Sequence, residues 1–452
     1  MSSDTKKEKT MTENKKKTIP RRPSGFPELL PGEQISFNRI LQEIKDVYES
    51  FGFSPIETPA LELSEVLLAK SAGDTEKQIY RFTKGDNDLA LHFDLTVPFA
   101  RYVAEHFSEL TFPFRRYQIQ KVWRAERAQK GRFREFLQCD VDIIGTKNMA
   151  SDAEILSVIF SVFQKIPSAG NFTVRISNKN ILTGFLENLG LDGITSEILR
   201  SIDKMEKIGE AGVLSELSLL NVSDANIEQI FSFLRTKGTN REILKKLASF
   251  NVLNNLFLLG ISELNAFVSF TEKMKLPQEN YKIDFTITRG LDYYTGTVYE
   301  TILNDYPELG SVCSGGRYDN LVGYYSSQSL SGVGVSIGLT RLFSKLKEID
   351  NLTVKKSSVA DVLIIHMSED LFSVSHKIAT DLRKSGIPTD EYLETAKIQK
   401  QMTYANKLGI PFVVILGSNE KINEMVTVKE MSTGLQSLVK QNNLAIWLKD
   451  KR

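Results

Sequence analysis

A predicted hairpin between residues 114 and 145 carries polar side chains at regular spacing. Its halves, RRYQIQKVWRAE and REFLQCDVDII, resemble two strands joined by the basic, glycine-containing loop AQKGRF. Because side chains alternate along a strand, Gln138, Asp140 and Asp142 share one face. Such a row is either solvated, in an edge hairpin with surface ion pairs, or it lines a polar pocket. This row alone leaves both interpretations open.

The same hairpin contains an aromatic residue in an unusual setting. Arg124, Glu126 and Arg134 lie on or near its faces, and Phe136 stands among the arginines. An aromatic ring in such surroundings favours stacking on a base. Phe136 therefore weighs against a purely solvated hairpin.

Two other stretches contain residues that could do chemistry. In LHFDLTVPFARY, Asp94 and Thr96 precede an amphipathic helix entered through Pro98, a pattern that by itself is most often only a helix cap. The run RGLDYYTGTVYE, from Arg289 to Glu300, is too polar for an ordinary buried strand. The strand predicted before it, KIDFTIT, would place its Asp and Thr side chains on one face.

Glycine-rich stretches follow that run. SGGRYD and GVGVSIG resemble strands in which missing side chains let a ligand or another backbone approach closely. Neither stretch is a P-loop, because no Gly-Lys-Ser/Thr follows the glycines.

The predicted elements around these stretches divide the chain into blocks. A helix over 36–52, capped by Ser36 and ended by Gly52, precedes the extended segment FSPIETPALE, which suits an edge strand. Short strands and one helix, 97–107, fill residues 79–144, and residues from about 172 to 278 have a helical pattern. Strands resume at 281 and end in a helix over 339–348.

Beyond residue 355 the pattern becomes βαβαβ, with helices over 370–385 and 395–408, then a hairpin and a final helix in LAIWLK. Continuous apolar strands that alternate with amphipathic helices predict a parallel or mixed sheet covered on both faces.

Bulk properties exclude several classes of protein. The 452 residues suggest two to four domains, and 57 Lys and Arg against 56 Asp and Glu leave a net charge of +1, so nucleic-acid contact needs local patches. Two distant cysteines and four scattered histidines predict neither disulfides nor a protein metal site. No apolar run is long enough for a membrane span. The lysine-rich start lacks a hydrophobic segment, so we expect a disordered tail, with an RNA-contacting arm as the alternative, and a cytoplasmic protein.

In this order, the stretches resemble the class II aminoacyl-tRNA synthetases, and specifically the histidyl-tRNA synthetase family. FRRYQIQKVWRAERAQKGRFREF resembles the second class motif, GVGVSIGLTRLF the third, and the helix ending near ESFGF with IETPALE the first, which forms the dimer interface in that family. RGLDYYTGTVYE and SGGRYDNLVG resemble stretches that are diagnostic of the histidine-specific members. The resemblance covers about residues 26–452.

The resemblance implies an α+β catalytic domain on an antiparallel sheet (26–171 and 279–350) with a helical insertion (172–278). A basic tail (1–25) precedes it, and a C-terminal α/β anticodon-binding domain with a mixed sheet (355–452) follows. The implied activity is that of a histidine–tRNA ligase, which joins L-histidine and ATP into histidyl-adenylate and pyrophosphate and then transfers the histidyl group to the 3′ end of tRNA(His). Mg²⁺ would accompany ATP, and the protein would be a homodimer.

Roles from the family fall on matching positions of this chain. The catalytic residues would be Arg124 and Arg289, which hold the ATP α-phosphate from two sides; Arg289 also approaches the histidine carboxylate. The α-amino group would be held by Asp94, Thr96 and Gln138, and the imidazole by Asp142, Tyr294 and neighbouring Tyr293. ATP would further contact Glu126, through its adenine amine or Mg²⁺, Phe136, through stacking, and Arg341, through the γ-phosphate.

Three departures from the family pattern stand out. His92 replaces a frequent arginine, Ala128 replaces a proline common in bacterial members, and RRPSGFPELLPGEQ lacks a usual Arg-Gly…Asp start, so no site is assigned there. The alternative is the regulatory subunit of ATP phosphoribosyltransferase, which shares the catalytic fold. That subunit typically lacks the C-terminal domain and several synthetase residues, whereas residues 355–452, Arg124 and Arg289 are present here.

Overall fold

In the computed structural model, the described residues are 18–69, 73–127, 131–288, 294–349, 352, 356–394 and 396–451. The predicted site residues Arg289 and Tyr293, together with Ala128 and most of the predicted tail, lie outside them.

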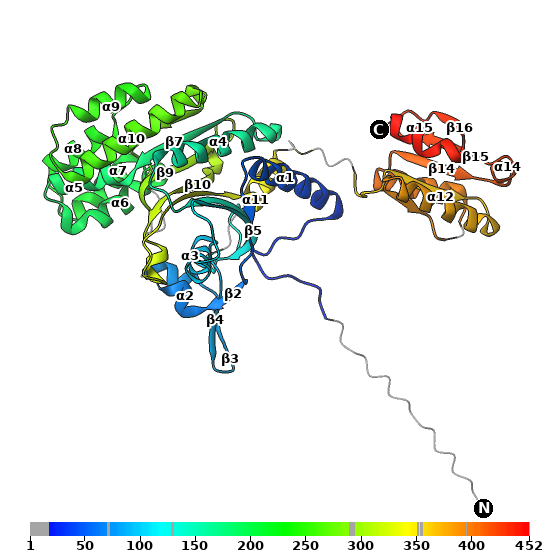
Figure 1. Cartoon of the computed structure of the whole chain (residues 1–452), viewed down its shortest axis with the longest axis horizontal. Helices are drawn as coiled ribbons and strands as arrows, with labels where there is room; N and C mark the ends of the chain where they lie inside the picture. Colours follow the sequence, from blue (N-terminus) through cyan, green and yellow to red (C-terminus); the bar gives the residue numbers. More distant parts are fainter. Residues whose placement is uncertain are drawn as a thin grey trace, which may run out of the picture.

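An eight-stranded sheet forms the centre of the larger unit (Figure 1). Its strands, in spatial order, are β1 (Ser54–Pro55), β5 (Phe114–Trp123), β6 (Glu135–Ile144), β11 (Ser331–Gly338), β10 (Ser311–Asp319), β9 (Tyr294–Leu303), β7 (Phe172–Asn178) and β8 (Tyr281–Ile283). Only the outermost pairs, β1 with β5 and β7 with β8, are parallel. The antiparallel catalytic sheet and the hairpin over 114–144 are therefore confirmed.

Helices cover one face of this sheet. They are α1 (Pro31–Ser50), α4 (Met149–Lys165) and α11 (Leu339–Glu348). Cys139, Val141 and Ile143 of β6 belong to the core beneath them, and the Tyr48 hydroxyl donates to the Cys139 carbonyl at 3.0 Å. The alternate residues of β6 must then face the opposite side of the sheet.

The first helix begins earlier than residue 36. Pro31 occupies its first turn, where a missing N–H costs nothing, and Glu33 accepts from the Leu30 backbone N–H at 3.2 Å. Ser36 instead lies inside the helix and donates to the Gly32 carbonyl at 3.1 Å. The predicted cap at Ser36 is therefore wrong.

A small three-stranded sheet lies beside the polar face. It contains, in spatial order, β2 (Leu61–Leu63), β4 (Asn87–Leu91) and β3 (Arg81–Lys84). The helix α2 (Ser64–Leu68) contacts β2 and β4 and also contacts α3 (Thr96–Glu105). The helix α3 is the one predicted over 97–107, with slightly different ends.

The helical segment contains α5 (Lys179–Asn188), α6 (Thr195–Asp203), α7 (Met205–Leu219), α8 (Asp224–Leu234), α9 (Asn240–Ala248) and α10 (Asn255–Lys273). It begins at Lys179 rather than at about 172, because β7 pairs with β9 as a strand of the main sheet. The domain division at the predicted bounds stays a prediction.

The predicted strand KIDFTIT is shorter than expected. It ends at Ile283, and the Asp284 carboxylate then accepts from the Thr286 backbone N–H at 3.1 Å, which turns the chain. The Thr288 hydroxyl donates to the Leu199 carbonyl of α6 at 2.8 Å. Asp284 and Thr286 still lie together, since Arg175 donates to both, at 2.9 and 2.5 Å, so the expected common face is wrong for Thr288 only.

The C-terminal residues form a unit with a five-stranded sheet and its own cores on both faces (Figure 1). Its elements are β12 (Val362–His366), α12 (Phe372–Lys384), β13 (Thr389–Glu391), α13 (Ile398–Leu408), β14 (Phe412–Leu416), α14 (Ser418–Ile422), β15 (Met425–Glu430), β16 (Gln436–Lys440) and α15 (Leu444–Lys451). Parallel pairing of β13, β12 and β14 and antiparallel pairing of β15 and β16 confirm a mixed sheet.

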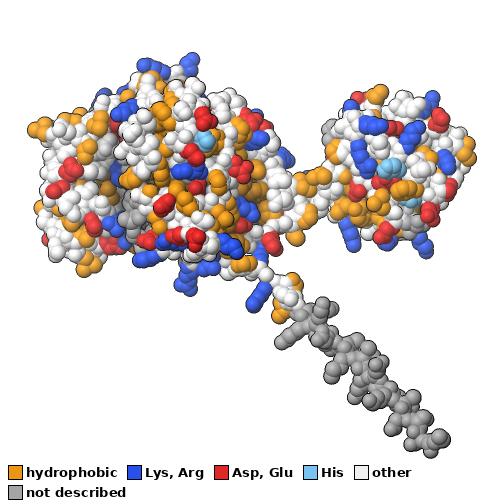
Figure 2. Space-filling view, turned by 60° about the horizontal axis from the view of Figure 1, so that its bottom comes forward, with side chains coloured by type: hydrophobic (Ala, Val, Ile, Leu, Met, Phe, Trp, Pro, Cys, Tyr) orange, Lys and Arg blue, Asp and Glu red, His pale blue; other side chains and the backbone are white. Residues whose placement is uncertain are grey.

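Charges of both signs are interspersed over the face seen in Figure 2, in keeping with the near-zero net charge. Among the helices of the described residues, none has the length and apolar character needed to cross a membrane.

Candidate active site

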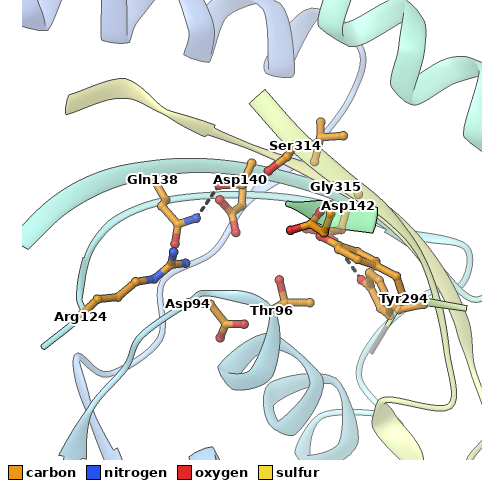
Figure 3. A pocket seen from close by; sticks show the side chains of 14 residues that line it. Asp94, Thr96, Arg124, Gln138, Asp140, Asp142, Tyr294, Ser314 and Gly315 are labelled. Carbon is orange, nitrogen blue, oxygen red and sulfur yellow. Dashed lines mark hydrogen bonds between the residues drawn. The ribbon is translucent and has the colours of Figure 1, made fainter. Parts of the chain in front are cut away.

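Polar side chains converge on a cavity of about 260 Å³ on the side of the sheet opposite α1 and α4 (Figure 3). In Figure 3, Gln138, Asp140 and Asp142 of β6 lie across from Asp94 and Thr96 at the start of α3. All six described residues of the predicted histidine site line this cavity: Asp94, Thr96, Arg124, Gln138, Asp142 and Tyr294. The structure therefore brings together residues spread over 200 positions of sequence, while their roles stay predictions.

A second cavity of about 210 Å³ adjoins the first. The two share the walls formed by Arg124, Gln138, Ser314 and Ser336. The second is lined by all four residues of the predicted ATP site: Arg124, Glu126, Phe136 and Arg341. Arg124 thus stands where the two predicted substrates would meet.

The floor of the first cavity is a lattice of cross-strand neighbours from β5, β6 and β11. Its rows are Arg116–Asp142–Gly334, Gln118–Asp140–Ser336 and Gln120–Gln138–Gly338. Gln138, Asp140 and Asp142 are 8%, 3% and 3% exposed. The interpretation of this polar row as the solvated face of an edge hairpin is therefore wrong, and the row lines a pocket.

Asp142 is held from two directions. Arg116, fully buried with its guanidinium 4.2 Å from the Phe99 ring centroid, places a nitrogen 2.8 Å from Asp142 Oδ2. The Tyr318 hydroxyl donates to Oδ1 at 2.9 Å. Burial raises the pKa of Asp142, and these two partners oppose that rise. A Cβ at Gly334 would lie 2.1 Å from Asp142 Oδ1, so only glycine leaves the carboxylate in this position.

Asp94 does two things at once. Its Oδ1 accepts from the Val97 backbone N–H at 3.2 Å, so it does cap α3, as the simplest interpretation of the sequence holds. The same buried side chain also lines the cavity, beside Thr96. A cap and a cavity wall are compatible here because α3 starts at the cavity.

Arg124 lies just past the end of β5 and is anchored through its Nε, which donates to the Phe93 carbonyl at 3.0 Å. Its guanidinium carbon lies 5.1 Å from the Phe136 ring centroid. Glu126 is paired with Arg132 at 3.2 Å, and Arg341 donates to the Leu309 carbonyl. The second cavity therefore presents positive charge and an aromatic face together.

Sequence reasoning assigned no role to several residues of the first cavity, among them Asp203, Ser314, Gly315 and Tyr318. A Cβ at Gly315 would lie 2.1 Å from the Gly334 carbonyl oxygen, which confirms the close backbone approach expected of the glycine-rich strands. Asp203 comes from the end of α6 in the helical segment, and no pattern in the sequence connects it with β6.

Asp140, in the middle of the floor, also received no role. Its side chain is buried, and its Oδ1 has no hydrogen-bond partner among the described residues. Burial raises the pKa of Asp140 to about 7; Arg116 and Ser336 act against this rise, whereas the carboxylates of Asp142 and Asp94 add to it.

The departures from the family pattern have a structural setting. His92 is buried, with Nε2 2.7 Å from the Lys121 carbonyl oxygen, and burial lowers its pKa. The segment before α1, residues 22–29, packs on the hairpin. The Gly25 carbonyl accepts from the Arg134 and Glu135 backbone N–H groups at 2.8 and 3.3 Å. Together with Phe136, residues 22–29 line a groove of about 690 Å³.

The pKa of Asp140 predicts a pH-dependent effect of Asp140→Asn on stability. In the folded protein this carboxyl keeps its proton up to about pH 7, whereas in the unfolded chain it ionises near 3.8. Wild-type stability therefore falls between about pH 4 and pH 7, by at most about 1.4 kcal/mol per pH unit, and asparagine removes that loss. The stability advantage of the variant should grow over this range and stay constant above it.

Thermal unfolding of both proteins between about pH 5 and pH 8.5 measures the effect. A Tm difference between the two proteins that does not change between about pH 5 and pH 7 would contradict the assigned pKa.

Comparisons with known proteins agree with this geometry. The family model described as "Histidyl-tRNA synthetase" matches residues 25–342, and the one described as "Anticodon binding domain" matches residues 361–451. A curated "Histidine--tRNA ligase" from Clostridium tetani is 52% identical over 414 residues, which are 91% of this chain and 94% of that protein.

Solved structures give the same picture. Histidyl-tRNA synthetase from Nostoc sp. PCC 7120 has a TM-score of 0.88 at 38% identity, covering 96% of this chain and 100% of that one. A Bacillus halodurans structure titled ATP phosphoribosyltransferase regulatory subunit/histidyl-tRNA synthetase has a TM-score of 0.72 at 21% identity, with 86% and 97% covered, and shows the fold alone. The family model and the relatives match most of the chain, including the segments that line both cavities. The chain therefore belongs to the histidyl-tRNA synthetase family.

Proposed function

We propose that this chain is a histidine–tRNA ligase. The observation that carries the proposal is the pair of adjoining cavities that share Arg124 as a wall, one acidic and polar, the other lined by arginine and aromatic groups. The full-length relatives named histidine–tRNA ligase support the same activity.

The first cavity is suited to histidine. Imidazole presents a polar nitrogen on each side, and the fixed Asp142 carboxylate and Tyr294 are the groups proposed to pair with them. An apolar amino acid offers neither group a polar nitrogen, and each hydrogen bond lost in this way costs about 1–3 kcal/mol. Competitors are therefore rejected at the imidazole position without an editing step. In this proposal, Asp94, Thr96 and Gln138 hold the α-amino group.

The second cavity is suited to ATP. Phe136 is proposed to stack on adenine, Arg124 to hold the α-phosphate and Arg341 the γ-phosphate. Mg²⁺ enters with ATP as part of the substrate, with Glu126 as the nearby carboxylate. A histidine carboxylate oxygen attacks the α-phosphorus, histidyl-adenylate forms and pyrophosphate leaves. Arg124, with Arg289 from the opposite side, stabilises the charge that grows on the phosphoryl oxygens.

The second step uses tRNA(His). A hydroxyl of its terminal ribose attacks the histidyl carbonyl carbon, the ester forms and AMP leaves. The match of residues 361–451 to an anticodon-binding domain supports a role for the C-terminal unit in holding the tRNA. A homodimer and a cytoplasmic location complete the proposal, as the family resemblance implies.

The regulatory subunit of ATP phosphoribosyltransferase is the weaker candidate. The likeness to a structure of that description extends to the fold only, at 21% identity. The 52% identity to a histidine–tRNA ligase and the C-terminal unit, present here, favour the enzyme.

Histidine-dependent exchange of pyrophosphate into ATP tests the proposal. Wild-type protein with Mg²⁺ should catalyse exchange with histidine and with no other standard amino acid. Arg289→His should abolish exchange while ATP binding is largely kept, because only the attack on the α-phosphate loses its stabilising charge.

Arg81→His, which changes an exposed arginine of β3 outside both cavities, is the matched control and should leave exchange unchanged. A wild-type protein without exchange would overturn the proposed function, and near wild-type exchange by Arg289→His would overturn only the role of that residue.

Removal of residues 355–452 tests the role of the C-terminal unit. Its sheet has separate cores, so the catalytic unit should keep exchange, whereas charging of tRNA(His) should fall by at least about tenfold as tRNA contacts are lost. Exchange and charging rates of the shortened and complete chains are compared. An equal loss of both activities would contradict a separate tRNA-binding role.

A further inference from the structure

Asp140 lies in the centre of the cavity floor, where the proposed function leaves it without a task. It is flanked along β6 by Gln138 and Asp142, and its side chain points toward the open space in Figure 3. Its cross-strand neighbours are Gln118 and Ser336. A carboxylate at this position is the most central acidic group of the floor.

The hydrogen bonds around Asp140 leave one oxygen unsatisfied. Ser336, which accepts from the Gln138 amide at 2.7 Å, is a hydrogen-bond partner of the Asp140 carboxylate. The other oxygen, Oδ1, has no hydrogen-bond partner among the described residues. It is also shielded from solvent, since Asp140 is only 3% exposed. A buried acceptor without a donor is destabilising, and more so if it is charged, so a donor from a ligand would stabilise it.

The charges around the cavity indicate the kind of donor. Among the described residues, four aspartates line it, Asp94, Asp140, Asp142 and Asp203, and one arginine, Arg124. Arg116, the buried guanidinium beneath the floor, is already paired with Asp142. The described lining of the cavity is therefore mostly acidic, which suits a cationic N–H donor rather than a neutral one.

The spacing along β6 indicates which part of the substrate meets Asp140. Residues two apart on one strand face are separated by about 7 Å. This is comparable with the distance between the amino nitrogen and the far imidazole nitrogen of histidine. With the imidazole at Asp142, the ammonium group comes to the neighbouring position on the strand.

We propose that Asp140 is a further substrate-binding residue, whose Oδ1 accepts a hydrogen bond from the α-ammonium group of histidine. The inference rests on the proposed function. It adds a third acidic group to substrate recognition and explains why an unsatisfied carboxylate is kept in the centre of the floor.

Two small inhibitors isolate this contact. Histamine has the imidazole and the ammonium group, and 4-ethylimidazole has the same skeleton without the ammonium. The ratio of their inhibition constants in the exchange reaction therefore measures ammonium recognition. In Asp140→Asn, the preference for histamine should fall by about tenfold, the low end for a hydrogen bond to a charged group. Affinity for 4-ethylimidazole should stay within about twofold.

Asp203→Asn is the matched control. It removes the same charge from the same cavity, but Asp203 is exposed, so solvent screens it. Its ratio should change by less than about threefold. If Asp203→Asn lowers the ratio as much as Asp140→Asn does, the effect is general electrostatics and the inference is overturned.

Other outcomes also decide. An unchanged ratio in Asp140→Asn means that Asp140 has a structural role only, and equal weakening of both inhibitors places it at the imidazole; either result overturns the inference. Asp140→Ser provides a second variant, with the same expected fall, if asparagine does not give folded protein. A wild type without histidine-dependent exchange overturns the proposed function instead, which the inhibitor ratio does not test.

Discussion

The alternation of side chains along β6 is the constraint on which the rest of the structure depends. Cys139, Val141 and Ile143 point into the core beneath α1 and α4, while Gln138, Asp140 and Asp142 point to the cavity. One strand thus anchors the catalytic unit and carries its recognition groups. A shift of its pairing by one residue would bury the carboxylates in the core and expose the apolar residues.

The polar face is stable only because its charges are partly compensated. Arg116 is fully buried, and removal of a partner from such a buried pair typically costs about 3–5 kcal/mol. It lies against Phe99 and beside Asp142, so a single guanidinium compensates the most constrained carboxylate. Asp140 interacts with the same guanidinium less directly, and its Oδ1 has no hydrogen-bond partner among the described residues, which is the oxygen proposed to meet the ammonium group. Stability is thereby given up for recognition, as is common in binding sites.

Much of this arrangement follows from local patterns. The hairpin, the shared face of Gln138, Asp140 and Asp142, and the mixed C-terminal sheet all depend on periodicity, which short segments of sequence carry. The family resemblance, rather than periodicity, joined Asp94 and Tyr294 to that face.

The parts that were missed depend on contacts between distant segments. The sequence pattern places β7 in the helical region, because its membership of the sheet depends on pairing with β9, more than 100 residues away. Asp203 and Arg116 were not recognised because α6 meets the cavity, and Phe99 meets Arg116, only in the folded chain. Local propensity contains no information on such neighbours.

The orientation of bound histidine is the central claim, and a crystal structure of the protein with L-histidine tests it most directly. The account predicts the imidazole within hydrogen-bond distance of Asp142 and the ammonium nitrogen within about 3 Å of Asp140 Oδ1, facing Asp94. A reversed histidine, with its imidazole at Asp94 and its ammonium group away from Asp140, would contradict it.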